Sequence, residues 1–331
     1  MATNQKMNSP KVAIIVPIYN PGIPALSRAL QSLCAQTLRE IEIICVLDCS
    51  TDGSDIFVKE LASTDDRIVV LKNDTNQGVS HSRNTGIAQA ILDGAEFIGF
   101  MDHDDYVDSS MYEKLYLHAT THNFDVVRCN TIIEENEHNK TTYFNDPTWD
   151  GIVRSLLLPF ESSQNLNKLS RSVWNGVYRT VIAKHVQFLN RSDYYEEDTL
   201  FNLEVCTLTK NIDCIPNVLY HWIKNPDSLS NEKISHQKVC NRFLNFLEYE
   251  WHLIKEKQIY SFMDAFHVTI SRFLRRYRTI ISTMDANYQH RLGCILTDCR
   301  FPILGRYEDL KIISKARIKL FFLVIRLKKL A

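Results

Sequence analysis

The sequence lacks the long apolar runs, the paired cysteines and the glycine-rich phosphate loops that identify several common classes of protein. No stretch approaches the roughly 18 uncharged apolar residues that a membrane-spanning helix needs. The first ten residues are polar and contain no apolar core of a signal peptide, so export is not expected. The nine cysteines are scattered without a CxxC pair, which indicates a reducing compartment rather than a disulfide framework or a zinc ribbon.

An excess of charge of either sign is also missing. The chain has 38 Lys and Arg against 39 Asp and Glu, so its overall charge does not indicate a nucleic-acid partner. At 331 residues it is long enough for one large domain with an appendage, or for two domains. No GxGxxG follows the first apolar run and no GxxxxGK[ST] occurs, which disfavours a dinucleotide-binding fold and a P-loop fold.

Short apolar runs alternate with helical patterns in the first hundred residues. The strands are expected at 11–20, 41–47, 68–71 and 97–101. Helical spacing is found over 21–37, through 56–61 and around 82–86. The first run is continuous and β-branched, as is typical of a strand buried on both faces of a parallel sheet. The alternation predicts an α/β fold with right-handed strand–helix–strand units in an open parallel sheet.

Polar clusters follow each of these four strands. They lie at 19–20, 48–54, 73–83 and 102–105. Ligands of open parallel sheets bind beyond the carboxyl ends of the strands. We therefore expect the four clusters to form one ligand-binding edge.

The last cluster concentrates negative charge. Asp102, Asp104 and Asp105 lie within four residues, directly after the run 97–101. Three close carboxylates repel one another unless water or a cation separates them, and hard oxygen ligands suit Mg²⁺ or Mn²⁺. The alternative is an acidic surface turn that caps a helix over 110–118.

The clusters also contain recognisable motifs. They are Val-Pro-Ile-Tyr-Asn at 16–20, Asp-Cys-Ser-Thr-Asp-Gly-Ser at 48–54, Ser-Arg-Asn-Thr-Gly at 82–86 preceded by Asn76 and Gly78, and Asp-His-Asp-Asp at 102–105. In this order and spacing they resemble the family 2 glycosyltransferases of the GT-A fold. The resemblance implies a Rossmann-like nucleotide-sugar domain over 11–230. Around it we expect a flexible N-terminus at 1–10, a helical extension at 231–305 and a basic amphipathic helix at 306–331.

The resemblance implies a nucleotide-sugar donor, with UDP as the expected nucleotide. Asp48 would accept a hydrogen bond from the uracil ring, and Pro17 and Tyr19 would supply apolar wall and stacking surface. The further donor contacts expected from the motifs are Asn20, Asp52, Arg83 and Asp102. The alternatives are an Asx turn for Asp48 and Asp52 and a surface ion pair for Arg83.

By the same resemblance, Asp102 faces ribose or metal, and Asp104 coordinates Mn²⁺ or Mg²⁺ together with the donor phosphates. Asp105 is a further candidate ligand for the metal. His103 stands where the family commonly has a small residue, which leaves open whether it adds a ligand.

A catalytic base is expected in the segment Glu-Glu-Asp-Thr-Leu-Phe at 196–201, which resembles the family's ED motif. Asp198 is the first choice and Glu197 the second. Crowded carboxylates raise the pKa of one member, which favours proton uptake near neutral pH. The alternative is that these acids only stabilise a helix N-terminus through the dipole.

The acceptor side is expected at Trp174 and Asn175, where the tryptophan would offer a flat face to a sugar ring. Core packing is the alternative for Trp174. The segment 221–230 resembles the loop that closes over the donor, and Ile223 stands where many relatives have an arginine. Lys224 or His221 is therefore expected to contact the phosphates.

From about residue 239 the pattern predicts two helices, the second with a concentration of arginines. In the last twenty or so residues, basic and apolar side chains occupy adjoining arcs of a helix, as in an interfacial helix on an anionic membrane. Packing on the protein or in a dimer is the alternative. The dense aliphatic face argues against a nucleic-acid arm.

Together these features predict an inverting, metal-dependent glycosyltransferase. It would transfer a sugar from a UDP-sugar to a saccharide or glycolipid acceptor, such as a lipid-linked precursor of lipopolysaccharide or capsule. We expect it in the cytoplasm, peripheral on the inner face of a bacterial membrane. One alternative is a sugar-phosphate nucleotidyltransferase, although 16–22 lacks the glycine-rich loop that this class needs. The other is a non-catalytic nucleotide- or glycan-binding module.

Overall fold

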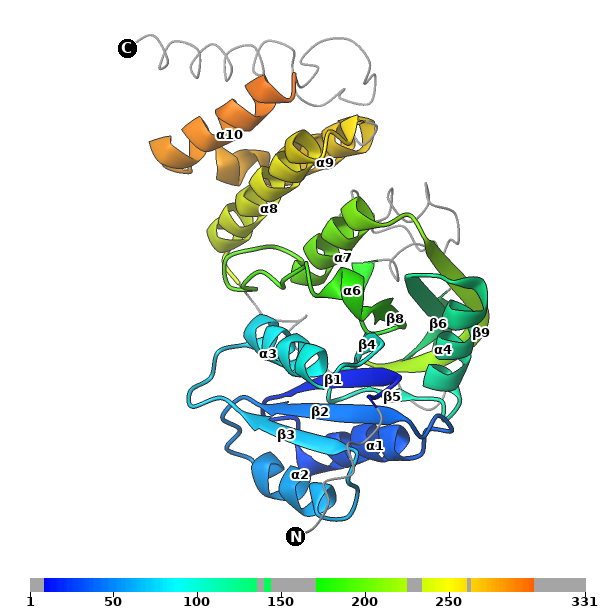
Figure 1. The fold of residues 1–331 in the computed structure, drawn as a ribbon. Coiled ribbons are helices and arrows are strands. Elements are labelled where there is room, and N and C mark those ends of the chain that lie inside the picture. The colour runs from blue at the N-terminus through cyan, green and yellow to red at the C-terminus, as the bar shows by residue number, and fades with distance from the viewer. Residues whose placement is uncertain (1–8, 136–139, 144–170, 225–233, 261–262, 301–331) are drawn as a thin grey trace. The chain divides into compact units, whose positions relative to one another are not determined.

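The computed structural model describes residues 9–135, 140–143, 171–224, 234–260 and 263–300. These residues divide into two compact units (Figure 1). The first contains the described residues up to 191 together with 196–224, and the second contains 192–195 and the described residues from 234 onward.

A mixed sheet forms the centre of the first unit. Its strands are β1 (Val12–Ile18), β2 (Ile41–Leu47), β3 (Ile68–Lys72), β4 (Phe97–Phe100), β5 (Tyr106–Val107), β6 (Val126–Glu134), β7 (Lys140–Tyr143), β8 (Gly176–Arg179) and β9 (Ile212–Ile223). They lie in the order β3-β2-β1-β4-β8-β6-β9-β5, and β7 pairs with β6. Strands β1 to β4 are parallel, and β8 runs antiparallel to both β4 and β6. The α/β class predicted from the sequence is confirmed.

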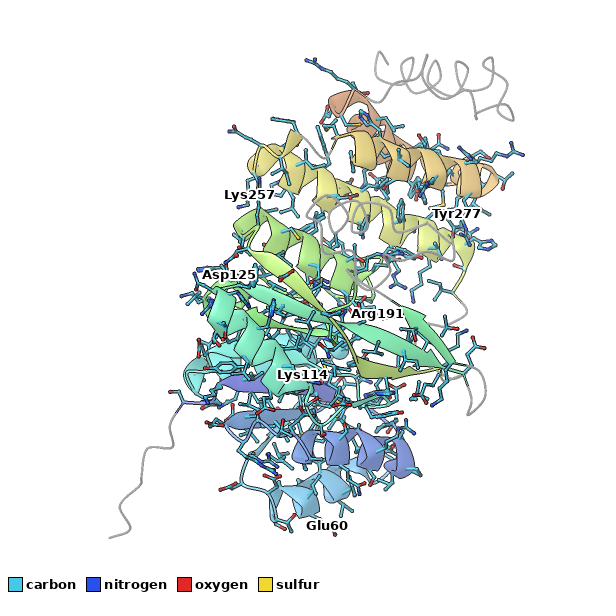
Figure 2. The ribbon with its side chains drawn as sticks, turned by 90° about the vertical axis from the view of Figure 1, so that its right-hand side faces the viewer. Glu60, Lys114, Asp125, Arg191, Lys257 and Tyr277 are labelled. Carbon is cyan, nitrogen blue, oxygen red and sulfur yellow. The ribbon has the colours of Figure 1, made fainter. Side chains whose placement is uncertain are left out.

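The helices of the first unit cover both faces of the sheet. They are α1 (Ile23–Cys34), α2 (Ser54–Ala62), α3 (Val79–Leu92), α4 (Met111–His122), α6 (Thr180–Ala183) and α7 (Glu197–Leu208). Figure 1 shows α1 and α2 on one side of strands β1 to β3 and α3 on the other. Charged side chains such as Glu60 on α2 and Lys114 on α4 lie on the outside of this unit (Figure 2).

Strand β1 explains why the first apolar run has no polar alternation. Ile14 and its even-numbered neighbours pack with Leu30 of α1 in one hydrophobic core. Ala13 and Ile15 pack with Ile87 of α3 in a second core on the opposite face. Because both faces of the strand are covered, every position has to be apolar. The two cores fix the carboxyl ends of the parallel strands at one edge.

Gly86 sets the distance between α3 and β1. A Cβ atom added at Gly86 would lie 2.4 Å from Cγ2 of Ile15, which is fully buried in the middle of the sheet. Helix α3 can approach the central strand this closely only because residue 86 has no side chain. The glycine of the Ser-Arg-Asn-Thr-Gly motif therefore has a packing role.

The second unit is helical. It contains α8 (His236–Glu256), α9 (Met263–Ile281) and α10 (Ala286–Asp298), whereas the sequence pattern predicted two helices. Buried aromatic rings of α8 and α9, among them Phe243 and Phe273 with centroids 4.2 Å apart, form its core. Among the described residues, no helix has the length and apolarity needed to cross a membrane. The predicted C-terminal helix at 306–331 lies outside the described residues.

The packing at Gly86 gives a stability prediction. Gly86→Ala should gain about 1 kcal/mol of helix propensity. Overpacking against Ile15 costs about 1–3 kcal/mol, and the central strand leaves little room to relax. We expect a net loss of about 1–2 kcal/mol in urea unfolding. His81→Ala, on the exposed face of the same helix, should change stability by less than about 0.5 kcal/mol. A stabilised Gly86→Ala protein would contradict this packing argument.

Candidate active site

The loops after β1 and β2 are joined by side-chain hydrogen bonds. The Asn20 N–H donates to Ser50 Oγ at 3.1 Å, and the Thr51 N–H donates to Asn20 Oδ1 at 2.7 Å. Asp52 accepts from the Gly22 N–H at 2.8 Å and from both the N–H and the hydroxyl of Ser54. Asn20 and Asp52, which the sequence suggested as donor contacts, thus hold the two loops together, and Asp52 forms the Asx turn considered as its alternative.

Asp48 lies at the carboxyl end of β2 and is almost fully buried. Its carboxylate accepts hydrogen bonds from Asn73 Nδ2 at 2.7 Å and from the N–H groups of Gln77 and Gly78 at 2.9 and 2.8 Å. These bonds tie the loop after β3 to β2. Nearby on β1, Pro17 is buried, whereas the ring of Tyr19 is 44% exposed.

Arg83 connects two distant motifs. Its Nη2 donates to Asp102 Oδ1 at 3.0 Å, and its Nη1 donates to Asp198 Oδ1 at 2.5 Å and lies 3.7 Å from Glu197 Oε1. The side chain is 4% exposed and its guanidinium lies 5.1 Å from the ring centroid of Phe188. Arg83 was expected as a nucleotide contact or a surface ion pair. The structure places it in a buried cluster with three carboxylates rather than in a surface ion pair, and its contact with a nucleotide stays a prediction.

The two acids at the start of α7 occupy different environments. Burial raises the pKa of Asp198 to about 7, although Arg83 opposes this shift. Burial alone would also raise the pKa of Glu197. Arg191, at 3.1 Å, and Arg83 outweigh this effect and hold the pKa below its usual value. The Asp198 side chain is 22% exposed and that of Glu197 only 5%. Of the pair, Asp198 is therefore the better proton acceptor for a bound molecule.

Each residue of the turn 102–105 is held by a different element. Asp102 accepts from Arg83 of α3, and the Nδ1 of His103 donates to the Pro17 carbonyl of β1 at 2.9 Å. Arg28 of α1 donates to the Asp104 carbonyl oxygen at 2.5 Å. Asp105 accepts from the hydroxyl of Tyr220 on β9. The turn therefore has a contact from each of four elements that are distant in sequence.

The carboxylate of Asp105 is turned into the protein. It is 1% exposed, and it accepts from the Tyr220 hydroxyl at 2.7 Å and from the Ile223 N–H at 2.8 Å. Burial, followed by the charges of Asp102 and Asp104, raises its pKa well above the usual range. Asp105 was expected as a metal ligand together with Asp102 and Asp104. Its two oxygens instead fasten the turn to β9.

Asp104 has the chemistry of a cation ligand. Among the described residues, no residue other than Asp104 itself is seen to donate a hydrogen bond to its carboxylate. Burial, followed by the charge of Asp102, raises its pKa, and its own backbone N–H is one of the groups that oppose this shift. No group of three or more His, Cys, Asp or Glu side chains suited to a metal occurs in this part of the chain. Carboxylate oxygens such as those of Asp104 and Asp102 are the hard ligands that Mg²⁺ and Mn²⁺ prefer, so the chemistry of this pair fits a divalent cation.

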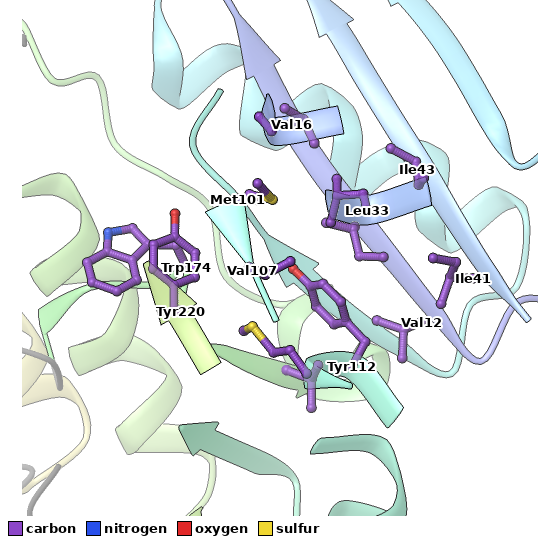
Figure 3. Close-up of a cluster of buried hydrophobic side chains, with 14 of the residues drawn as sticks. Val12, Val16, Leu33, Ile41, Ile43, Met101, Val107, Tyr112, Trp174 and Tyr220 are labelled. Atoms are coloured by element: carbon purple, nitrogen blue, oxygen red, sulfur yellow. The ribbon is translucent and has the colours of Figure 1, made fainter. Parts of the chain in front are cut away.

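The residues expected on the acceptor side lie in the interior. Trp174 stacks on Tyr220 with ring centroids 4.2 Å apart, as Figure 3 shows. Asn175 is fully buried, and its Nδ2 donates to the Cys129 carbonyl at 3.0 Å. Trp174 thus has the core-packing role considered as its alternative, and neither side chain is accessible to a sugar in this conformation.

The two side chains expected to contact phosphate, those of Lys224 and His221, lie against glutamates at the end of β6. Lys224 forms an ion pair with Glu135. The Nδ1 of His221 lies 2.8 Å from Glu134 Oε1, and its ring stacks on Tyr106. A phosphate contact from either side chain would have to compete with these carboxylates. The following segment, 225–233, lies outside the described residues.

Sequence reasoning missed Arg28, Arg191 and Tyr220. Arg28 is exposed on α1 and reaches the turn only through its long side chain. Arg191 lies six residues before Glu197, and no motif marks it. Tyr220 directly follows the apolar residues 218–219 of β9, where an aromatic residue normally signals core packing. None of the three had a local signal that pointed to the site.

The Arg83 cluster makes a pH-dependent stability prediction. In the folded protein Arg83 opposes the effect of burial on the pKa of Asp198 and Glu197. Arg83→Ala should therefore lower the free energy of unfolding most at a pH at which these carboxylates are ionised. We expect a loss of about 3–5 kcal/mol in urea unfolding at pH 8. At pH 5.5 the loss should be smaller, because Asp198 takes up a proton.

Arg83→Ala in the Asp198→Asn protein is the matched control for this prediction. The amide introduced at position 198 in that background does not titrate, whereas burial raises the pKa of Asp198 in the unmodified protein to about 7. The loss of stability on changing Arg83 should then differ much less between the two pH values. An equal loss at both pH values for Arg83→Ala would argue against the charged cluster.

Comparison with known proteins places this site in a family. The chain is 34% identical over 227 residues to the uncharacterized glycosyltransferase EpsJ of Bacillus subtilis, covering 67% of this chain and 63% of EpsJ. It is 36% identical over 97 residues to the GalNAc(5)-diNAcBac-PP-undecaprenol beta-1,3-glucosyltransferase of Campylobacter jejuni, covering 29% of this chain and 30% of that protein. The chain thus matches less than two thirds of the length of these relatives.

The fold has a counterpart among solved structures. The crystal structure of S. aureus TarS 1–349 in complex with UDP-GlcNAc matches with a TM-score of 0.66 at 20% identity, covering 88% of this chain and 82% of that one. This likeness confirms the GT-A fold expected from the motifs. The model of the family named Glycosyl transferase family 2 matches residues 13–183, more than half of the chain. The chain therefore belongs to glycosyl transferase family 2.

Proposed function

We propose that the protein is an inverting, metal-dependent glycosyltransferase that transfers a sugar from a UDP-sugar to a saccharide acceptor. One observation carries this proposal. A single guanidinium, that of Arg83, joins Asp102 on the donor side at 3.0 Å to Asp198 on the acceptor side at 2.5 Å. A site for group transfer needs both a holder for the leaving group and a base, at a fixed distance from each other.

Asp198 is the proposed base. Its raised pKa and partial exposure suit the removal of a proton from an acceptor hydroxyl near neutral pH. In inversion the oxygen of this hydroxyl forms the new bond to the anomeric carbon as the bond to the nucleoside diphosphate breaks. Arg83 and Arg191 keep Glu197 ionised, so that the proton goes to Asp198.

Asp104 and Asp102 are the proposed holders of Mn²⁺ or Mg²⁺. When bound, such a cation neutralises the charge that develops on the diphosphate leaving group. Asp104 is favoured as the main ligand because no other described residue is seen to donate to its carboxylate, whereas Asp105 is engaged by Tyr220 and Ile223. The Arg28 bond to the Asp104 carbonyl leaves its side-chain oxygens available.

The nucleoside is proposed to bind between Tyr19 and Asp48. The exposed ring of Tyr19 offers a stacking surface beside Pro17. A carboxylate has about four lone-pair sites, so Asp48 can accept one further N–H after its three protein donors. The choice of UDP agrees with the TarS complex, which contains UDP-GlcNAc.

A lipid-linked acceptor is the proposed class, such as a precursor of lipopolysaccharide or capsule. The name of the Campylobacter relative includes an undecaprenol-linked saccharide. The basic and apolar arcs of 306–331 suit a helix on an anionic membrane surface, at the cytoplasmic face. Lys224 is retained as a candidate phosphate contact once donor binding competes with Glu135.

The base assignment predicts both a rate and a pH profile. Asp198→Asn should lower kcat by about 10²- to 10⁴-fold. In the unmodified protein kcat/KM should rise with pH through about 7, because the base must be deprotonated. These values are measured as release of UDP from a panel of UDP-sugars with Mn²⁺, first with water and then with candidate glycolipid acceptors.

Glu197→Gln is the control for the base. It should lose less activity than Asp198→Asn and should keep the rise of kcat/KM with pH. Full activity of Asp198→Asn would refute the assignment. Failure of the unmodified protein to bind UDP or to turn over any UDP-sugar would argue for a different donor or a non-catalytic role.

The membrane proposal is tested with vesicles. Changing Lys311, Lys315 and Lys319 together to Gln should weaken binding to phosphatidylglycerol-containing vesicles about 100-fold, because each lysine contributes about 1 kcal/mol. Phosphatidylcholine vesicles should bind the unmodified protein weakly. The same change at Lys238, Lys255 and Lys257 is the charge-matched control. Equal effects of the two triple variants would oppose a role for 306–331.

A further inference from the structure

The hydroxyl of Tyr220 spans the turn 102–105 from its first residue to its last. It donates to Asp105 Oδ2 at 2.7 Å and accepts from the Asp102 N–H at 3.4 Å. The turn's own backbone bond, from the Asp105 N–H to the Asp102 carbonyl, is 3.3 Å long. One buried hydroxyl therefore reinforces the closure of the turn that carries Asp104.

Tyr220 is itself held firmly. Its ring is fully buried and stacks on Trp174 with the ring planes 24° apart (Figure 3). Its backbone pairs with Val107, and three residues later the Ile223 N–H donates to the other oxygen of Asp105 at 2.8 Å. Strand β9 thus contacts both oxygens of one carboxylate from one rigid side.

These contacts separate the roles of the turn carboxylates. The two oxygens of Asp105 face donors of β9, whereas the carboxylate of Asp104 has no donor from any other described residue. A carboxylate turned inward in this way can set the shape of the turn without touching a ligand above it.

We propose that Tyr220, acting through Asp105, is a positioning residue that shapes the turn for a divalent cation and the donor diphosphate at Asp104. This inference rests on the function proposed above. Tyr220 and Asp105 do not coordinate the cation. Hydrogen bonds one layer behind metal ligands orient them, and their loss typically costs about 10- to 100-fold in metal affinity.

The test measures Mn²⁺ affinity of the full chain at saturating UDP, from the electron paramagnetic resonance signal of free Mn²⁺. Tyr220→Phe should weaken Mn²⁺ binding about 10- to 100-fold, and Asp105→Asn should do so to a similar degree. The two changes break the same interaction, so their effects should not add. The Mn²⁺ affinity of the double variant should lie within about twofold of that of the more impaired single variant. Asp104→Ala should abolish measurable binding.

Tyr178→Phe is the matched control. Tyr178 is also a fully buried tyrosine of the same sheet, and its hydroxyl donates to Asn202 Oδ1 at 2.8 Å, away from the turn. This variant loses a buried hydroxyl but should keep the Mn²⁺ affinity of the unmodified protein within about twofold. An equal loss in Tyr178→Phe and Tyr220→Phe would indicate general loosening and overturn the proposal.

The remaining outcomes are equally decisive. Unchanged Mn²⁺ affinity in Tyr220→Phe overturns the positioning role. Complete loss of binding in Asp105→Asn, as in Asp104→Ala, makes Asp105 a ligand and also overturns it. If Tyr220→Phe does not fold, Asp105→Asn decides between these results, because it keeps the Tyr220 ring. If the unmodified protein fails to bind Mn²⁺ with UDP, the proposed function itself fails.

Discussion

The buried guanidinium of Arg83 is the contact on which the candidate site depends. A buried cation is costly unless its charge and its hydrogen bonds are compensated, and three carboxylates surround Arg83. Two of these come from the start of α7 and one from the turn after β4. The three elements share one charge: withdrawal of α7 would remove two of the carboxylates of Arg83, and withdrawal of the turn would remove the third. This shared charge keeps segments about a hundred residues apart in one arrangement.

The same charge also separates the two acids of α7. Glu197 is compensated by Arg83 and Arg191 and remains ionised, whereas the pKa of Asp198 is raised by its burial and by the nearby carboxylates. Two neighbouring acids with the same chemistry thus acquire different tasks from their surroundings. The sequence motif alone offers both residues as candidates. The choice between them follows from exposure and from the number of cations that each one contacts.

Local patterns predicted the parallel half of the sheet well. The second strand was expected at 41–47 and is found there, because the apolar run 43–47 within it reflects burial on both faces. The acidic turn after β4 was also predicted, since strand ends of this fold collect ligand-binding residues. These features depend on neighbours in the chain, which a sequence pattern records directly.

The contacts that give similar residues of the site different roles could not be predicted from local patterns. Asp105 and Asp104 are adjacent and chemically identical, yet only the pairing of β5 with β9 turns one of them inward. Trp174 resembles a sugar-binding aromatic in sequence, but its stacking partner lies 46 residues further along the chain at Tyr220. The missing information in each case is which distant strands are neighbours.

The strand order adds a consequence for the turn 102–105. Strands β4 and β5 are separated in the sheet by β8, β6 and β9, although only Met101 to Asp105 joins them in the chain. Four strand spacings in a flat sheet amount to about 19 Å. The six Cα-to-Cα steps from Phe100 to Tyr106 span that distance only when the chain is fully extended, at about 20 Å, and this link is a closed turn. The sheet must therefore curl until its far edge returns to its middle. The acidic turn is the short link that joins the two ends of this curled half of the sheet. Its geometry therefore depends on the correct pairing of β5, β6, β8 and β9.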